Sequence, residues 1–249
     1  MSVNVKSKSS TVLLKMVVLA MMVALGVIIS PILRVEGMCP MAHFINIVVS
    51  VFLGPWYSLL CATLIGIIRM SIMGIPPLAL TGAVFGALLS GLFYRASKGR
   101  LIFAVIGEII GTGIIGAIAS YPVMTLWWGK TDLTWFFYIP SFISGTLIGG
   151  SIAFLFLKKL AKTGLLTKYQ RILGCKAYDN KENVISDSFG IAFIGVIVWL
   201  ALTVLFNTLL NMKDGFVPYI PYIALGLFII AAVVYLIVNR RNNRVEIKE

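Results

Sequence analysis

The residue of this sequence that most needs a chemical explanation is Glu108, an acid inside an apolar stretch long enough to cross a bilayer. The stretch predicts a helix over residues 101–121, with Glu108 roughly 10 Å along it at about 1.5 Å per residue. Gly107 and Gly111 give this helix a face of small residues that another helix can approach closely. A carboxyl group at that depth is costly, so we expect Glu108 either to contact a ligand or to hold helices together by pairing.

A second pair of polar side chains, His43 and Asn46, begins the helix expected at 41–53. Their i, i+3 spacing places them on one helix face. Both can donate and accept hydrogen bonds, which suits an azole nitrogen or a small hydroxyl group. A histidine near a helix end is often structural, but here a polar loop with Arg34 and Glu36 precedes it at the same outer level. We therefore predict that these four residues contact a small neutral heterocycle, with the loop covering it.

Arg69 and two aromatic residues complete the predicted binding set. Arg69 lies near the outer end of its helix, where it either pairs with Glu36 or Glu108 or faces the ligand. Aromatic residues crowd the outer loops, and most are expected to form an interfacial belt. Tyr121 and Trp128 are our choices for stacking on a flat ring.

A different kind of site is indicated on the first helix, where Ala20 and Ala24 are four residues apart and Gly26 follows. Such spacing lets a second helix approach closely in lipid. The pattern is common, so it indicates either internal packing or contact with a partner protein.

Signatures of enzymes and of metal sites are missing from the sequence. Its three cysteines are scattered and it has one histidine, so neither a disulfide framework nor a zinc cluster is expected. It contains no His-Glu-x-x-His, no phosphate-binding loop of the Walker type and no Gly-x-Ser-x-Gly. We expect no catalysis and no cofactor, and energy for any transport would come from a partner or an ion gradient.

The composition defines the class of protein that must position these side chains. Of the 249 residues 59% are hydrophobic and 12% are charged, whereas a soluble domain needs more charge to cover its surface. The sequence therefore predicts an all-α integral membrane protein. We expect its helices at 16–30, 41–53, 57–73, 76–94, 101–121, 136–157, 190–210 and 218–238. Gly54-Pro55 separates the second from the third, because proline breaks a helix.

The distribution of positive charge predicts the orientation. With eight spans and a cytoplasmic N-terminus, all but four of the 21 Lys and Arg residues fall in cytoplasmic segments; the four are Arg34, Arg69, Lys130 and Lys213. This placement explains the net charge of +12 without nucleic acid binding. We expect a multi-pass protein of the cell membrane with both termini in the cytoplasm.

The chain is predicted to have three parts. Residues 1–162 would form a six-helix substrate-binding bundle, residues 163–189 a basic cytoplasmic connector, and residues 190–249 an extra transmembrane hairpin with a cytoplasmic tail. No internal repeat is evident, so a transporter built from inverted repeats is not supported.

Several separated motifs over about residues 13–162 resemble those of ThiW-type proteins, in the same order. They are Leu33-Arg34-x-x-Gly37-Met38-x-Pro40-Met41-x-His43-Phe44-Ile45-Asn46, Leu53-Gly54-Pro55-Trp56-Tyr57, Gly66-x-x-Arg69-Met70, Gly82-x-x-Phe85-Gly86-Ala87 with Tyr94-Arg95, Gly107-Glu108-x-x-Gly111-Thr112-Gly113-x-x-Gly116, and Pro140-Ser141-Phe142. The C-terminal hairpin departs from the family pattern.

The resemblance implies a substrate-binding S component of an energy-coupling factor (ECF) vitamin transporter. Such proteins are six-helix bundles with an outward-facing pocket, and they associate with a transmembrane T component and two cytosolic ATPases. The implied cargo is a thiamine precursor, the hydroxyethylthiazole moiety, carried inward when the S component topples in the membrane. The family's first-helix contact with the T component maps onto Ala20 and Ala24.

Two other functions remain as alternatives. One is a stand-alone secondary transporter of a small heterocycle, for which Glu108 is the deep acid that could hold a coupling ion. The other is a membrane-embedded enzyme that acts on lipid or peptide.

Overall fold

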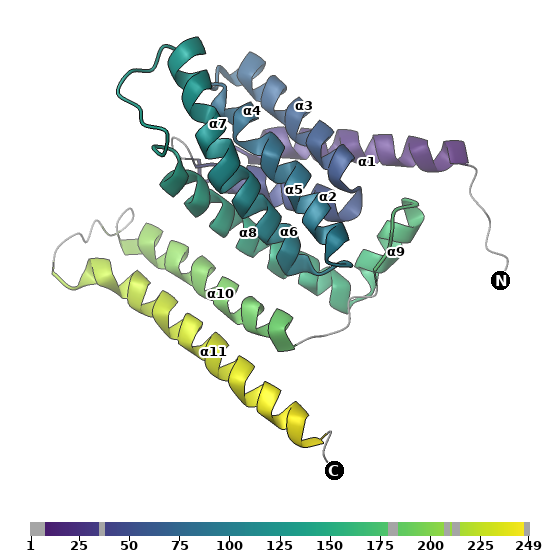
Figure 1. Ribbon diagram of the computed structural model, residues 1–249, viewed down its shortest axis with the longest axis vertical. Coiled ribbons are helices and arrows are strands. Elements are labelled where there is room, and N and C mark those ends of the chain that lie inside the picture. Colours follow the sequence, from purple (N-terminus) through teal and green to yellow (C-terminus); the bar gives the residue numbers. More distant parts are fainter. Residues whose placement is uncertain (1–7, 35–37, 179–183, 207–209, 211–214, 247–249) are drawn as a thin grey trace.

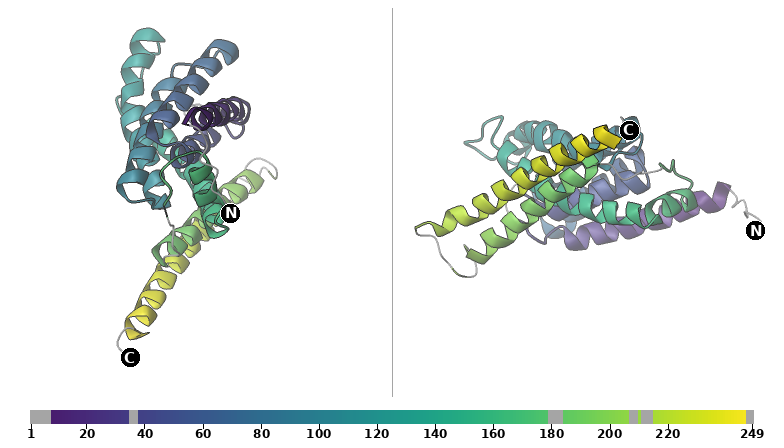
Figure 2. Two further views of the ribbon diagram at one scale, coloured as in Figure 1. Left: turned by 90° about the vertical axis from the view of Figure 1, so that its right-hand side faces the viewer. Right: turned by 90° about the horizontal axis from the view of Figure 1, so that it is seen from below.

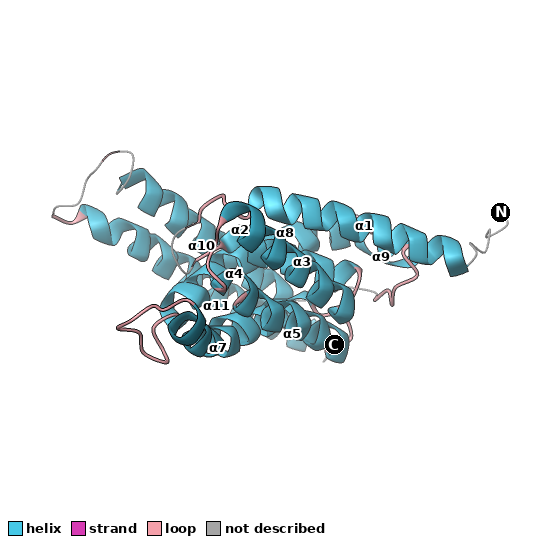
Figure 3. Cartoon of the chain, turned by 90° about the horizontal axis from the view of Figure 1, so that it is seen from above, coloured by secondary structure: helices cyan, strands magenta, loops and turns pink. Residues whose placement is uncertain are grey.

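The computed structural model describes residues 8–34, 38–178, 184–206, 210 and 215–246, and within them all regular structure is helical (Figures 1 and 3). Seven helices are long and apolar enough to cross a membrane, and an eighth, of 13 residues, is apolar but shorter. The eight predicted helices are thus present in the predicted order. The predicted fold class, an all-α integral membrane protein with a six-helix bundle and a C-terminal hairpin, is confirmed.

The first six spans form the bundle. They are α1 (Lys8–Ile29), α2 (Pro40–Phe52), α3 (Pro55–Met73), α4 (Leu78–Thr81) with α5 (Ala83–Ala96), the continuous helix α6 (Leu101–Glu108), η1 (Ile109–Gly116), α7 (Ala117–Pro122) and η2 (Val123–Trp127), and finally α8 (Ile139–Lys162). Two stretches of this continuous helix, η1 and η2, are wound as π-helix.

The predicted break between the second and third helices is where the sequence places it. Gly54 has φ +93°, a conformation that residues with a side chain rarely adopt, and Pro55 is the first residue of α3. Pro40 likewise begins α2. Because α2 is confined between these two signals, it rises only about 20 Å at about 1.5 Å per residue, less than the ~30 Å hydrocarbon core.

Short α2 lies at the centre of the bundle, in contact with α1, α3, α5, α6 and α8. Most of its residues are buried, including the polar His43, Asn46 and Ser50. Helix α5 packs closely against α6 and η1 through glycines: a Cβ on Gly107 would lie 2.5 Å from the Leu89 carbonyl oxygen. The small-residue face predicted around Glu108 is therefore a helix-packing face.

The hairpin of α10 (Val184–Val204) and α11 (Ile220–Glu246), preceded by η4 (Val217–Tyr219), lies beside the bundle. Helix α10 packs against α8, and α11 packs against α10 on the side away from the bundle (Figure 2). Only 11% of the apolar window of α11 is buried, against 56% for Leu101–Trp127, so the outer helix of the hairpin presents its surface to lipid.

The predicted polar connector contains a helix that the sequence analysis did not foresee, α9 (Leu165–Ile172). Its Gln170 is fully buried and donates from Nε2 to the Val51 carbonyl oxygen at 2.9 Å and to the Tyr94 hydroxyl at 3.1 Å. These bonds hold α9 against the end of α2. Figure 1 shows α9, the start of α1 and the end of α11 in the right and lower parts of the view, and the loop after η2 at the upper left.

The tight contact between α5 and α6 generates a prediction. Gly107→Ala should destabilise the bundle by about 1–3 kcal/mol, because the new methyl group must displace backbone atoms of α5. The matched control is Gly226→Ala in α11, where a Cβ meets nothing within 4 Å. Apparent melting temperatures of the purified proteins in detergent would compare the two, and equal values would contradict the close packing.

Candidate functional site

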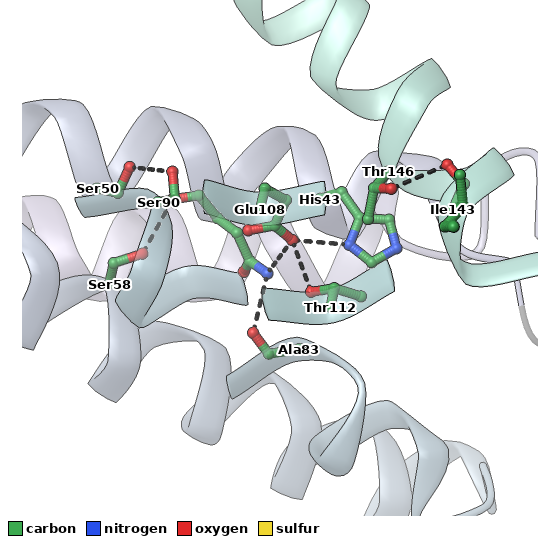
Figure 4. Close-up of polar contacts among 10 residues, drawn as sticks. His43, Ser50, Ser58, Ala83, Ser90, Glu108, Thr112, Ile143 and Thr146 are labelled. Carbon is green, nitrogen blue, oxygen red and sulfur yellow. Dashed lines mark hydrogen bonds and ion pairs between the residues drawn. The ribbon is translucent and has the colours of Figure 1, made fainter. Parts of the chain in front are cut away.

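The centre of the bundle holds a polar cluster built on one carboxylate oxygen. Glu108 Oε1 accepts hydrogen bonds from His43 Nδ1 at 2.9 Å, Asn46 Nδ2 at 3.0 Å and Thr112 Oγ1 at 3.1 Å (Figure 4). His43 and Asn46 come from α2, whereas Thr112 lies one turn beyond Glu108 on η1. The structure thus brings Glu108 together with His43 and Asn46, the pair that the sequence analysis selected on a different helix.

The chain positions this cluster through helix spacing and small residues. Glu108 is the last residue of α6, where the winding changes to π-helix, a feature that is frequent at functional sites. Glycines of α8 also make room beside α2: a Cβ on Gly149 would lie 3.0 Å from His43 Cβ. A Cβ on Gly86 of α5 would lie 2.8 Å from Glu108 Oε2. The carboxylate is therefore enclosed by three helices that approach more closely than larger residues allow.

Because these side chains are buried, their hydrogen bonds determine how the helices can be arranged. Glu108 is fully buried, and Asn46 and His43 are 3% and 6% exposed. Oε1 has three donors, but Oε2 has no hydrogen-bond partner among the described residues. A buried polar network of this kind specifies one arrangement of the helices, because each donor moved off the carboxylate would be left unsatisfied. The structural pairing that the sequence left open for Glu108 is present.

Polar contacts continue along the same face of α2. The Ser50 hydroxyl lies 2.8 Å from that of Ser90 on α5. The Ser58 hydroxyl of α3 donates to the Asn46 carbonyl oxygen at 2.9 Å. Ser50 follows Asn46 by four residues, and that spacing is the signal by which the sequence could have revealed it.

A pocket of about 70 Å³ opens where α1 ends and α2 begins. Its lining includes Arg34, Cys39, His43, Arg69, Thr112 and Phe142, with apolar residues from the segment that joins α3 to α5. Sites that enclose drug-sized ligands measure about 300–1,000 Å³, so the pocket in this form suits only a small molecule. Glu108 and Asn46 lie behind His43 and are not part of the lining.

Arg69, at the end of α3, lines the pocket and is 3% exposed. Its Nη2 lies 3.4 Å from the Cys39 sulfur, and its Nε has no partner among the described residues. Arg69 does not pair with Glu108, which was one of the alternatives, because the Glu108 carboxylate is bonded to His43, Asn46 and Thr112. Glu36, the other expected partner and a predicted ligand contact, lies outside the described residues.

The two predicted stacking residues are not brought to the pocket. Tyr121 packs on Trp135 with ring centroids 4.4 Å apart, and Trp128 is 51% exposed. Phe142, at the start of α8, is the aromatic residue of the lining. It was missed as a site residue because belt aromatics and pocket aromatics look alike in sequence.

On the far side of the bundle, Ala20 and Ala24 are exposed and line an apolar groove between α1 and α3. Leu64 and Ile68 supply the α3 wall of this groove. Among the described residues, Ala20 and Ala24 are therefore not packed inside the bundle, which was one of the two roles left open for them.

The cluster generates a prediction about stability. Glu108→Ala should destabilise the protein by about 3–5 kcal/mol, because three buried donors lose their shared acceptor and Asn46 Nδ2 alone keeps another, the Ala83 carbonyl oxygen at 3.3 Å. Thr112→Val removes one donor and should cost about 1 kcal/mol. The control, Thr146→Val, removes a buried hydroxyl that bonds within its own helix to Ile143 O, and it should change stability least. Apparent melting temperatures that do not follow this order would rule out the cluster as the centre of the fold.

Comparison with known proteins identifies the relatives of this chain. The family model described as thiamine-precursor transporter protein (ThiW) matches residues 16–163, which is more than half of the chain. The match begins in α1 and ends just after α8, so it covers the six-helix bundle and excludes the hairpin. No curated protein and no solved structure matches.

Proposed function

Because the chain belongs to the ThiW family of thiamine-precursor transporters, we propose that it is the substrate-binding S component of an ECF-type importer for the hydroxyethylthiazole moiety. The family is one of transporters, which supports a multi-pass membrane protein that binds a small molecule. The proposal adds the mode of coupling, the partners, the site residues and the cargo.

The observation that carries the proposal is the position of His43. Its Nδ1 donates to Glu108, so in the neutral ring Nε2 is the acceptor, and the ring lines the pocket. The hydroxyl group of hydroxyethylthiazole can donate to that nitrogen. Asn46 and Glu108 then serve to hold the imidazole in this tautomer and orientation rather than to touch the substrate.

The site supports binding without chemical change. Thr112 lines the pocket, but its hydroxyl donates to Glu108, and the Glu108 carboxylate is buried, accepts three donors at Oε1 and is not part of the pocket lining. Within the described residues no group of three or more His, Cys, Asp or Glu side chains is placed to hold a metal ion. We therefore propose that the chain delivers its cargo unaltered and has no enzymatic activity.

The proposed partners are a transmembrane T component and two cytosolic ATPases. The groove beside Ala20 and Ala24 is apolar and open, as a surface that receives another helix in lipid must be. In this arrangement both termini and α9 are cytoplasmic, the pocket faces outward, and ATP hydrolysis in the partners drives the toppling of the bundle. Residues 1–162 are the functional unit, joined by 163–189 to an added hairpin within 190–249.

One observation favours the rival, a secondary transporter. Glu108 Oε2 is buried without a partner among the described residues, which is where a coupling ion could bind. Uptake of labelled hydroxyethylthiazole in cells lacking the ATPase subunits separates the two mechanisms. The ECF proposal expects that uptake to be lost.

The proposal predicts that His43→Ala weakens hydroxyethylthiazole binding at least about tenfold, the equivalent of ~1.4 kcal/mol, because the pocket loses its acceptor. Calorimetry with the purified protein measures the change. Ser151→Ala is the control, since that buried hydroxyl bonds within its own helix to Leu147 O. Normal membrane insertion of His43→Ala with unchanged affinity would refute the role of His43.

The partner surface gives a separate prediction. Ala20→Trp combined with Ala24→Trp should abolish copurification with the T component, because two indole rings fill the groove. The control pair, Met21→Trp with Leu25→Trp, places two indole rings at exposed positions of α1 outside the groove lining and should keep the complex. An intact complex in the first pair would remove this face from the interface.

A further inference from the structure

The pocket has an unbalanced charge. Arg34 and Arg69 both line it, and no carboxylate belongs to the lining among the residues that the structure describes. Glu108 is the acid of the polar cluster, but it is not part of the lining, and its Oε1 is bonded to His43. The wall that a ligand would touch therefore carries two guanidinium groups and no described negative charge.

The burial of Arg69 makes this excess of positive charge energetically costly. Arginine stays protonated in proteins, and Arg69 is 97% buried, with no partner for its Nε among the described residues. The hydrogen bond that the described part of the chain gives it runs from Nη2 to the Cys39 sulfur at 3.4 Å, and sulfur is a weak acceptor. A buried charge needs a partner of opposite sign or strong acceptors. Among the described residues the structure supplies neither, so the ligand is the natural source.

The two polar regions of the pocket lie at different depths. Cys39, which contacts Arg69, precedes His43 by four residues, about one helical turn or ~5.4 Å along α2. Apolar side chains, among them Leu78 and Phe142, complete the wall. A ring can therefore lie between a cationic outer end and an imidazole farther in.

We propose that the substrate is an anionic thiazole, whose carboxylate or phosphate group binds Arg34 and Arg69 while the ring lies against the apolar wall. This inference rests on the proposed function in that the same pocket takes up a thiazole for import, and it replaces the neutral hydroxyethylthiazole, with its hydroxyl bond to His43, by an anionic thiazole. A guanidinium group donates two parallel hydrogen bonds to a carboxylate or phosphate, a geometry that a neutral alcohol does not match. At the buried Arg69 this attraction is stronger than it would be in water.

The test compares three probes by calorimetry on the purified full-length protein: hydroxyethylthiazole, its phosphate monoester, and 4-methylthiazole-5-carboxylate. We expect at least one anionic probe to bind ten times more tightly than the alcohol. If only the monoester binds more tightly than the alcohol, the anionic group of the substrate is a phosphate. If only the carboxylate does, that group is a carboxylate. Equal or tighter binding of the alcohol overturns the inference but keeps the proposed function, whereas no binding of any probe overturns both.

Variants then locate the anion. Arg69→Gln should lower the affinity for the anionic probe at least tenfold more than the affinity for the alcohol, and Arg34→Gln should act in the same direction. Arg69→Lys keeps the positive charge but cannot donate two parallel hydrogen bonds, so it should retain part of the preference that Arg69→Gln loses. Anion preference in Arg69→Lys would also show that the effect of Arg69→Gln is not a folding defect. Arg171→Gln, an exposed arginine of α9, changes the net charge equally and should keep the preference. A preference that survives Arg69→Gln and Arg34→Gln would overturn the assignment.

Discussion

The arrangement of the bundle depends on the hydrogen bonds that converge on Glu108. A carboxylate in the middle of a membrane protein is tolerated when its oxygens have partners, and here α2 and η1 provide three donors to Oε1. This requirement fixes the rotation of α2, because only one face of that helix carries both His43 and Asn46. It also fixes the imidazole ring, so the same interaction that holds the helices together presents His43 to the pocket.

Glycine makes that interaction geometrically possible. Gly86, Gly107 and Gly111 let α5 approach α6 and η1, and Gly149 lets α8 approach α2. Without the hydrophobic effect as a force between helices in lipid, close packing and interhelical hydrogen bonds are what bring them together. The glycines and the carboxylate therefore act jointly, since His43 and Asn46 of α2 reach Glu108 only in a closely packed bundle, whereas Thr112 bonds from the same continuous helix.

The sequence predicted the helices well because apolar length and the Gly54-Pro55 break are local signals. It also selected His43, Asn46 and Glu108, because ionisable and amide groups at membrane depth are rare. It could not show that Tyr121 and Trp128 lie away from the pocket while Phe142 lines it, since that depends on which way a helix faces. Helix α9 was missed because Gln170 gains its partners, Val51 and Tyr94, only from distant parts of the chain.

The shortness of α2 has a consequence for how the membrane surrounds the pocket. Since α2 is 13 residues long and begins at Pro40, it rises about 20 Å and leaves part of a ~30 Å hydrocarbon core that this helix does not cross. The pocket at the start of α2 therefore lies beside the part of the core that this helix leaves uncrossed. A bound molecule would already sit inside the membrane's insulating layer before any part of the protein moves, which shortens the remaining path to the opposite side.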